Sequence, residues 1–216
     1  MQKIHEKLLA GSAPVWQRLV DHEFLRRTAD GTIPDDTFKI WMKQDYLFVR
    51  EAIPFIAVLL AKAPLHLRTP LIGVLIALDK ELEMFRKNAA AHGVDLTDIE
   101  AAPTCLAYLQ FLMTVGYNRS FTEGFTVLYA AEKAYLDSWV QVKEGLRGES
   151  PWREFIDNWA GDSFKKYVAW LAETLDELTA AAPEHEIERL GELFNQVARY
   201  EFLFWEMALT EQSWPV

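Results

Sequence analysis

Hydrophobic residues recur at helical spacing along nearly the whole chain. They return every three or four positions, and no segment keeps the strict apolar and polar alternation that marks a half-buried strand. Glycine and proline are scarce, at 10 and 9 of 216 residues, which also favours helices over a fold rich in turns. The pattern therefore predicts an all-α protein.

Breaks in this pattern separate the expected helices. We expect helices over residues 4–28 with a kink near Pro14, 34–63 with a bend near Pro54, 70–92, 104–115, 120–144, 151–158, 162–181 and 184–210. Prolines near several starts and Gly93 after one end are typical of helix boundaries. Because no linker, repeat or low-complexity tract divides the helices, we expect a single helical domain over residues 1–216.

Charge and cysteine content narrow the function. The net charge is −10, and no basic run that would follow a phosphate backbone occurs, so we expect no nucleic-acid partner. The single cysteine, Cys105, excludes an intramolecular disulfide and cysteine zinc sites, and it suits a reducing compartment. The first residues lack the apolar core of a signal peptide, and no apolar stretch approaches the roughly 20 residues of a membrane span. We therefore expect a soluble, cytoplasmic protein with no membrane partner.

Three acids lie within aromatic helix faces. Asp45 interrupts a strongly apolar stretch and shares a face with Trp41 and Phe48, at i−4 and i+3. In two later predicted helices, Glu132 shares a face with Tyr129, Tyr135 and Trp139, and Glu201 shares one with Phe204 and Trp205. An ionised, unpaired carboxylate in a core destabilises the fold by roughly several kcal/mol. Each acid therefore needs a cationic partner, contact with solvent or a bound ligand.

Ordinary partners are also available for each acid. Lys43 and Arg50 are candidates for Asp45, Lys133 and Lys143 are candidates for Glu132, and Glu201 and Glu206 could both lie exposed on the rim of their helix. The alternative is that the three faces converge on one pocket. Two facing carboxylates in a dry pocket cannot both ionise cheaply, which yields an acid and a base side by side. The third would suit a flat heterocycle that presents a ring nitrogen and an amino group.

Other chemistries have weaker support in the sequence. The five histidines form neither a His-x-x-x-His nor a Glu-x-x-His pair, so we expect no metal and no cofactor. A lone His22 is more typical of a structural residue than of a haem ligand. Cys105 has no basic neighbours, and we interpret it as a small buried hydrophobic residue. No phosphate-binding loop, Gly-x-Ser-x-Gly motif or dinucleotide fingerprint occurs.

Three motifs resemble the TenA (thiaminase II) family: WMKQDYLFVR at 41–50, FIDNWAGDSF at 155–164 and YEFLFWEMA at 200–208. The resemblance extends over essentially the whole chain. It implies a haem-oxygenase-like helical bundle without haem, and a pocket for 4-amino-2-methylpyrimidines derived from thiamin. It also implies hydrolytic salvage of that pyrimidine by a homotetramer or homodimer.

The resemblance also assigns roles to individual residues. Asp45 matches the aspartate that binds the aminopyrimidine edge, and Tyr46 and Phe48 follow it into the pocket. Tyr108 and Tyr135 match pocket tyrosines.

In the later motifs, Trp159 stands where many members have another tyrosine. Glu201 matches the catalytic glutamate of the last helix, although Glu206 lies close enough to confuse the assignment. Trp205 and Glu206 complete the candidate substrate-binding set.

One departure from the family pattern concerns the nucleophile. The commoner branch has a cysteine four residues before the central tyrosine, where this chain has Ala131 followed by Glu132. Cys105 belongs to a different predicted helix and cannot replace it. The pattern resembles a second branch with glutamate in place of cysteine. That branch is suited to 4-amino-5-aminomethyl-2-methylpyrimidine or its N-formyl derivative, with little or no thiamin cleavage.

These observations predict a C–N hydrolase. Glu132 and Glu201 would share the proton transfers, and the substrate would be the partner of the buried Asp45. Two alternatives remain open: a non-catalytic pyrimidine carrier or sensor, and an oxidase resembling pyrroloquinoline-quinone synthase or a di-iron oxygenase, against which the shortage of histidine argues. The sequence leaves open the amino or formylamino preference, which glutamate is the acid, the choice between Glu201 and Glu206, and the oligomer size.

Overall fold

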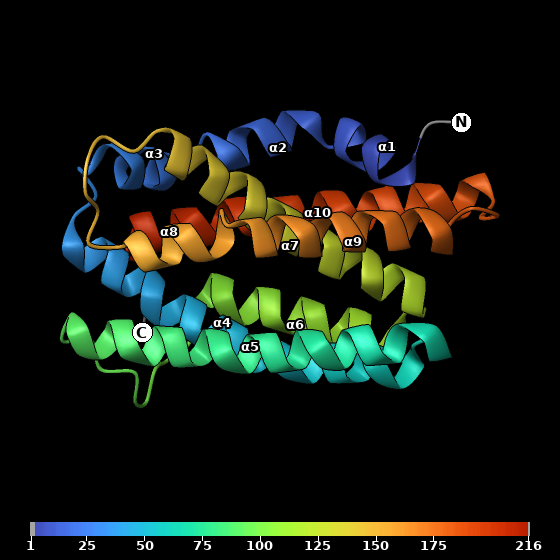
Figure 1. The fold of residues 1–216 in the computed structure, drawn as a ribbon, viewed down its shortest axis with the longest axis horizontal. Helices are drawn as coiled ribbons and strands as arrows, with labels where there is room; N and C mark the ends of the chain where they lie inside the picture. Colours follow the sequence, from blue (N-terminus) through green and yellow to red (C-terminus); the bar gives the residue numbers. More distant parts are fainter. Residues whose placement is uncertain (1–2, 216) are drawn as a thin grey trace. The chain divides into compact units, whose positions relative to one another are not determined.

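The computed structural model describes residues 3–215, which form ten α-helices and no strand (Figure 1). The helices are α1 (Ile4–Gly11), α2 (Ala13–Val20), α3 (Glu23–Asp30), α4 (Asp35–Lys62), α5 (Leu65–Ala91), α6 (Pro103–Asn118), α7 (Phe121–Glu144), α8 (Arg153–Trp159), α9 (Asp162–Leu178) and α10 (Glu184–Leu209). Within the described range, none of them combines the length and apolarity needed to cross a membrane. The expected all-α class is confirmed.

The chain divides into two compact units. The first unit comprises Met1–Ile33 and Phe125–Glu206, and the second comprises Pro34–Gly124 and Met207–Val216. One boundary therefore falls between α3 and α4, and the other two fall inside α7 and α10. The expectation of a single domain over residues 1–216 stays a prediction.

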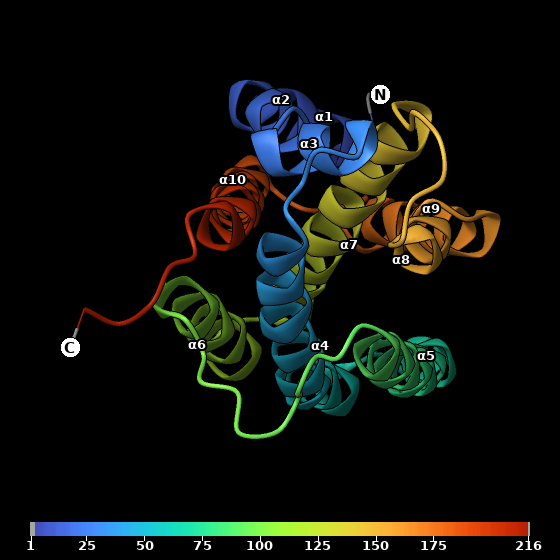
Figure 2. The same ribbon diagram turned by 90° about the vertical axis from the view of Figure 1, so that its left-hand side faces the viewer.

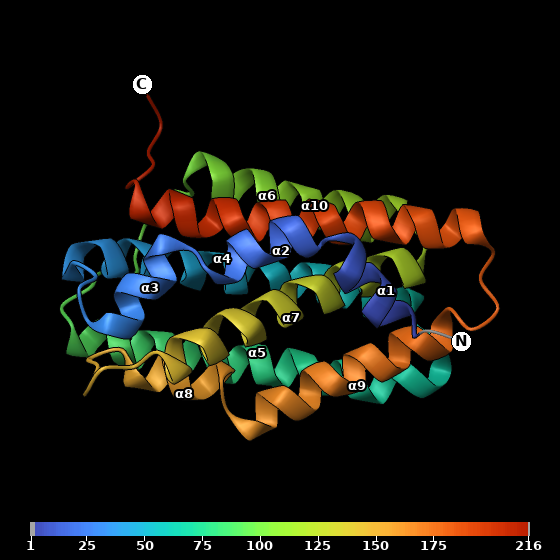
Figure 3. The same ribbon diagram turned by 90° about the horizontal axis from the view of Figure 1, so that it is seen from above.

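In the first unit, α7 lies between α10 on one side and α8 and α9 on the other (Figures 2 and 3). Helices α1, α2 and α3 lie across one face of this arrangement (Figure 1). A contact between distant segments joins α1 to α9, where His5 Nδ1 lies 2.8 Å from Asp176 Oδ2. The core of this unit is unusually aromatic and includes the fully buried Trp139, Trp159 and Trp205.

In the second unit, α4 packs between α5 and α6 (Figure 2). Lys62, at the end of α4, donates hydrogen bonds to the carbonyls of Gly116, Tyr117 and Arg119. These contacts satisfy carbonyl groups at the end of α6 and place a cation at the negative end of its dipole. The Gln44 side chain donates to the Glu100 carbonyl, which fixes the loop that leads into α6.

Two predicted helix boundaries were wrong. The segment 4–28 forms three helices, because Ser12 and His22 adopt non-helical backbone angles before α2 and α3. Pro14 lies in the first turn of α2, where its missing N–H removes no helical hydrogen bond. Helix α5 begins at Leu65, directly after Pro64, and Pro70 lies inside it instead of opening it. Helix α4, in contrast, continues through Pro54 as the sequence predicted.

Candidate active site

Asp45 lies in the middle of α4 in the second unit. Its exposed fraction is 0%, and Trp41, one turn earlier on the same face, is equally buried. Arg50, one of the two expected cationic partners of Asp45, lies instead against Glu51, with Nε and Oε1 2.9 Å apart. The acid in this apolar helix is therefore deeply buried.

Two aromatic residues that follow Asp45 in α4, Tyr46 and Phe48, pack against rings of the neighbouring helices. The rings of Phe48 and Tyr108 pack with their centroids 4.7 Å apart, which joins α4 to α6. Tyr46 packs against Phe85 of α5 at 6.1 Å. The guanidinium of Arg86 lies 5.8 Å from the centroid of the Tyr46 ring. Three of the predicted binding residues, Tyr46, Phe48 and Tyr108, thus form part of an aromatic layer around α4.

Cys105 is fully buried in α6, as the sequence predicted for a small hydrophobe. Its Sγ lies 3.7 Å from the Gln44 carbonyl oxygen, to which it donates. The pKa of the Cys105 thiol is raised to about 12, mainly by burial and to a smaller extent by the negative charge of Asp45. The group is a thiol at neutral pH, and a thiol is a poor nucleophile.

Glu132 lies in α7 of the first unit, and the pKa of its carboxyl group is strongly perturbed. The residue keeps some exposed surface, but burial of its carboxyl group raises its pKa to about 7. The Tyr167 hydroxyl donates a hydrogen bond of 3.2 Å to Oε1 and partly opposes this rise. The proposed surface partners lie elsewhere: Lys133 contacts Asp137, and Lys143 contacts Asp157.

Aromatic rings pack close to the helix that carries Glu132. Tyr135, one turn after Glu132, contacts Trp159 edge-on and Trp205 in a tilted arrangement, each at 5.4 Å. Trp139 stacks on Trp159 at 5.2 Å. The structure thus brings together three of the predicted binding residues, Tyr135, Trp159 and Trp205, within the first unit.

The two glutamates of the last helix have different surroundings. Glu201 is 1% exposed, whereas the Glu206 side chain is 44% exposed. Glu206 Oε2 lies 3.0 Å from Nε2 of the buried His22. His22 Nδ1 accepts from the Phe24 N–H, so the proton of neutral His22 is on Nε2 and is donated to Glu206. Glu206 is therefore engaged at a helix start, and Glu201 is the buried acid.

His22 is a structural residue, as the sequence suggested. Its ring caps the start of α3. Burial lowers the pKa of His22, and the adjacent Glu206 opposes this shift. Burial is the larger effect and favours the neutral imidazole, whose tautomer is defined by the hydrogen bond that Nδ1 accepts from the Phe24 N–H.

Comparison with known proteins places the chain in a family. The profile of the TENA/THI-4/PQQC family matches residues 10–211. The chain belongs to this family. The "Aminopyrimidine aminohydrolase" of Halalkalibacterium halodurans is 29% identical over 209 residues, which cover 93% of each chain. The resemblance inferred from the three motifs is confirmed.

Solved structures agree with this family assignment. A TenA homologue from Pyrococcus furiosus is 38% identical, with a TM-score of 0.93 over 95% of this chain and 99% of that chain. A domain of unknown function from Shewanella denitrificans with a heme oxygenase-like fold is 13% identical, with a TM-score of 0.79 over 95% and 92%. The expected haem-oxygenase-like fold is confirmed.

For this member of the TENA/THI-4/PQQC family, sequence reasoning missed one contact of the candidate site. Tyr167 of α9 was not among the predicted residues, although its hydroxyl contacts Glu132. An available signal was the aromatic stripe Phe164, Tyr167 and Trp170, spaced three residues apart on one helix face.

The candidate residues are distributed over both units. Asp45 belongs to the second unit, whereas Glu132 and Glu201 belong to the first. Their convergence on one pocket stays a prediction. Among residues 3–215, no group of three or more His, Cys, Asp or Glu side chains is arranged to hold a metal ion.

Proposed function

We propose that this member of the TENA/THI-4/PQQC family is an aminopyrimidine aminohydrolase that salvages the pyrimidine of thiamin. Family relatives from three bacteria carry that name, at 23–29% identity over most of the chain. The observation that supports this proposal is Glu132, whose pKa of about 7 suits acid–base catalysis. We propose 4-amino-5-aminomethyl-2-methylpyrimidine, or its N-formyl derivative, as the substrate.

Glu132 is suited to transfer a proton at neutral pH. With a pKa of about 7, both its protonated and its ionised forms are well populated there. The Tyr167 hydroxyl, which donates to Oε1, favours the ionised form and fixes the orientation of the carboxyl group. We assign Glu201, the buried acid of α10, as the second proton-transfer group.

The proposed reaction is hydrolysis of a C–N bond. Water loses a proton to one glutamate as its oxygen bonds to the reacting carbon, and the other glutamate protonates the departing nitrogen. With the aminomethyl compound, the products are the hydroxymethyl pyrimidine and ammonia. With the N-formyl compound, attack at the formyl carbon gives the aminomethyl pyrimidine and formate.

Asp45 is the proposed binding group for the pyrimidine. A carboxylate accepts hydrogen bonds from an exocyclic amino group and from a protonated ring nitrogen. A substrate that supplies such donors offsets part of the cost of burying Asp45. Aromatic side chains, among them Phe48 and Tyr135, are proposed to pack against the flat ring.

Thiamin itself is proposed to be a poor substrate. Ala131 provides no nucleophile one turn before Tyr135. Cys105 does not replace it, because its thiol has a pKa of about 12 and stays protonated.

Assembly and location are part of the same proposal. We propose a homotetramer or homodimer, as the family resemblance implies, and a cytoplasmic location, which the single cysteine suits. No metal or other cofactor is part of the proposed reaction.

The test is turnover by the purified protein on thiamin, the aminomethyl pyrimidine and its N-formyl derivative, compared side by side. We expect hydrolysis of one or both pyrimidines, and we expect Glu132→Gln to lower kcat by about 10²–10⁴-fold. Glu144→Gln, which neutralises an exposed acid of the same helix, is the matched control and should keep full activity. Asp45→Asn should mainly raise KM.

Three results would reject the proposal in different ways. Efficient cleavage of thiamin would show that the absence of a cysteine at position 131 does not limit the enzyme. Tight pyrimidine binding without turnover would favour a carrier or sensor. Bound iron on elemental analysis, or oxygen consumption, would favour an oxidase.

A further inference from the structure

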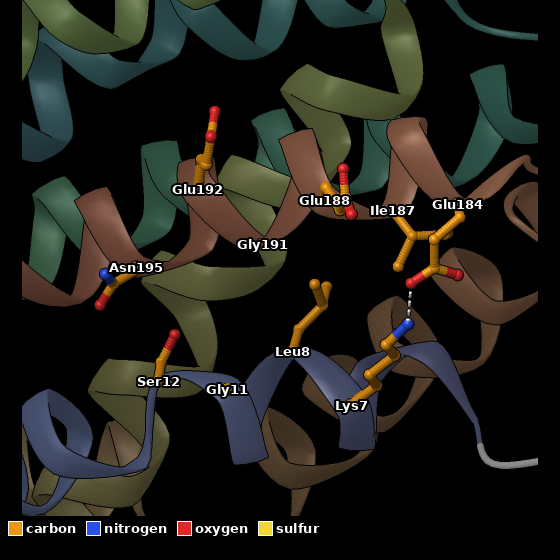
Figure 4. Close-up of a pocket in the computed structure, with 10 residues that line it drawn as sticks. All are labelled: Lys7, Leu8, Gly11, Ser12, Glu184, Ile187, Glu188, Gly191, Glu192 and Asn195. Carbon is orange, nitrogen blue, oxygen red and sulfur yellow. Dashed lines mark hydrogen bonds and ion pairs between the residues drawn. The ribbon is translucent and has the colours of Figure 1, made fainter.

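A surface groove lies between α1 and α10 of the first unit (Figure 4). Its volume is about 280 Å³, close to the lower end of the roughly 300–1,000 Å³ typical of small-ligand sites. The lining residues are Lys7, Leu8, Gly11, Ser12, Glu184, Ile187, Glu188, Gly191, Glu192 and Asn195. None of the acids, bases or aromatic residues of the candidate active site is among them.

The strongest indication of a ligand is Ser12. This residue is only 2% exposed, and its hydroxyl forms no hydrogen bond with any described residue. Figure 4 shows the hydroxyl directed from the junction of α1 and α2 toward α10. Because Ser12 lines the groove, solvent can reach its hydroxyl, and a ligand in the groove would replace water as its hydrogen-bond partner.

Asn195 faces Ser12 from the opposite wall. It lines the groove at the end nearest Ser12, and within the described part of the chain its amide also has no hydrogen-bond partner (Figure 4). The two side chains do not bond to each other. Together they offer oxygen acceptors from two sides of the same gap.

Charge and shape define the ligand class. Lys7 and Glu184 form an ion pair of 2.7 Å at one end of the groove, so their charges offset each other. Glu188 and Glu192 are exposed at the α10 rim, and neither has an ion-pair partner among the described residues. Their charges favour a cation.

The floor of the groove is apolar. Leu8 and Ile187 are both buried there, and neither Gly11 nor Gly191 places a side chain in the space. Figure 4 shows the Leu8 side chain reaching toward α10. An alkyl chain fits this floor, whereas a hydrated metal ion does not benefit from it.

We propose that this groove binds a small organic cation of the alkyl diamine class. One ammonium group lies between the Ser12 hydroxyl and the Asn195 amide oxygen, and the alkyl body covers Leu8 and Ile187. The second ammonium lies near Glu188, which is seven residues, or about 10 Å along the helix axis, from Asn195. This inference is independent of the proposed hydrolase activity.

The test is titration calorimetry of the full-length protein with 1,5-diaminopentane, and with uncharged 1,5-pentanediol for comparison. We expect saturable binding of the diamine that weakens with added salt, and no binding of the diol. Ser12→Ala and Glu188→Gln should each weaken binding by about tenfold, because each removes one hydrogen-bonding or charged contact.

Glu186→Gln is the matched control. It removes the same charge from an exposed position of the same helix that does not line the groove, and it should change the affinity less than about twofold. Equal weakening by Glu186→Gln and Glu188→Gln would overturn the proposal, because it would show attraction to general surface charge. Absence of saturable binding, or equal binding of the diol, would also overturn it. Pyrimidine hydrolysis should be unchanged in Glu188→Gln.

Discussion

At the scale of single residues, Glu132 shows how the property that suits its proposed catalytic role opposes stability. Its pKa is about 7 in the folded protein and about 4.5 in an unfolded chain, so the folded state holds the proton more tightly. The folded state therefore loses stability as pH rises through this range. The cost above neutral pH is on the order of 3 kcal/mol.

Replacing Glu132 with Gln should make the protein more stable at alkaline pH. Gln keeps the shape and an acceptor for Tyr167 but cannot ionise. We compare the free energy of unfolding of Glu132→Gln with that of the wild type. The difference, in favour of the variant, should increase by about 2 kcal/mol between about pH 5 and about pH 8. Urea unfolding at both pH values measures this difference. Glu144→Gln should show no such growth, and a gap for Glu132→Gln that does not vary with pH would contradict the prediction.

Sequence reasoning identified buried acids better than it identified their partners. Asp45 and Glu201 were chosen for their aromatic neighbours, and both are essentially fully buried. The contact between Tyr167 and Glu132 joins residues 35 positions apart, and the one between His22 and Glu206 joins residues 184 apart. Helical periodicity reports only which residues share a helix face, so neither pair was predictable from it.

At the scale of helices, the division of the first predicted helix depends on two residues with non-helical backbone angles. His22 is extended and caps α3 with its ring, and α3 ends at Gly31, which has a φ of 78°. Positive φ is readily adopted by glycine, so the helix end was accessible to sequence reasoning. A histidine cap was not, because Ser, Thr, Asp and Asn are the usual capping residues.

Substitution of His22 separates its capping role from its buried contact. His22→Ala removes both the acceptor for the Phe24 N–H and the donor to Glu206, and it should cost about 1–3 kcal/mol of stability. His22→Asn keeps a capping acceptor and should recover part of that loss. Urea unfolding of both variants at pH 7 provides the measurement. Equal losses for the two variants would mean that the cap contributes nothing.

At the scale of the whole molecule, an exposed apolar stripe bears on assembly. Leu65, Ile72 and Ile76 of α5 are 80%, 47% and 55% exposed, and their spacing of seven and four residues puts them on one helix face. Exposed apolar groups that gather on one face are typical of protein interfaces. We expect a second copy of the chain to cover this face in the proposed oligomer.

A charge placed on this face should weaken the assembly. Ile72→Lys combined with Ile76→Lys should lower the mass measured by light scattering after size-exclusion chromatography, because a buried lysine without a partner disfavours association. Ala90→Lys, at an exposed position near the end of α5, is the control and should leave the mass unchanged. An oligomer that survives the double substitution would place the interface elsewhere.

The sequence by itself determined the helical class and the family, and it supplied the acids that are proposed for the candidate site. These follow from local patterns, since residues that share a helix face and residues within a motif are close along the chain. Tertiary structure decided that Tyr167 contacts Glu132, that His22 engages Glu206 instead of Glu201, and that Ser12 and Asn195 face one groove. Each of these joins side chains of different helices, and their meeting depends on how the helices pack, which no local pattern specifies.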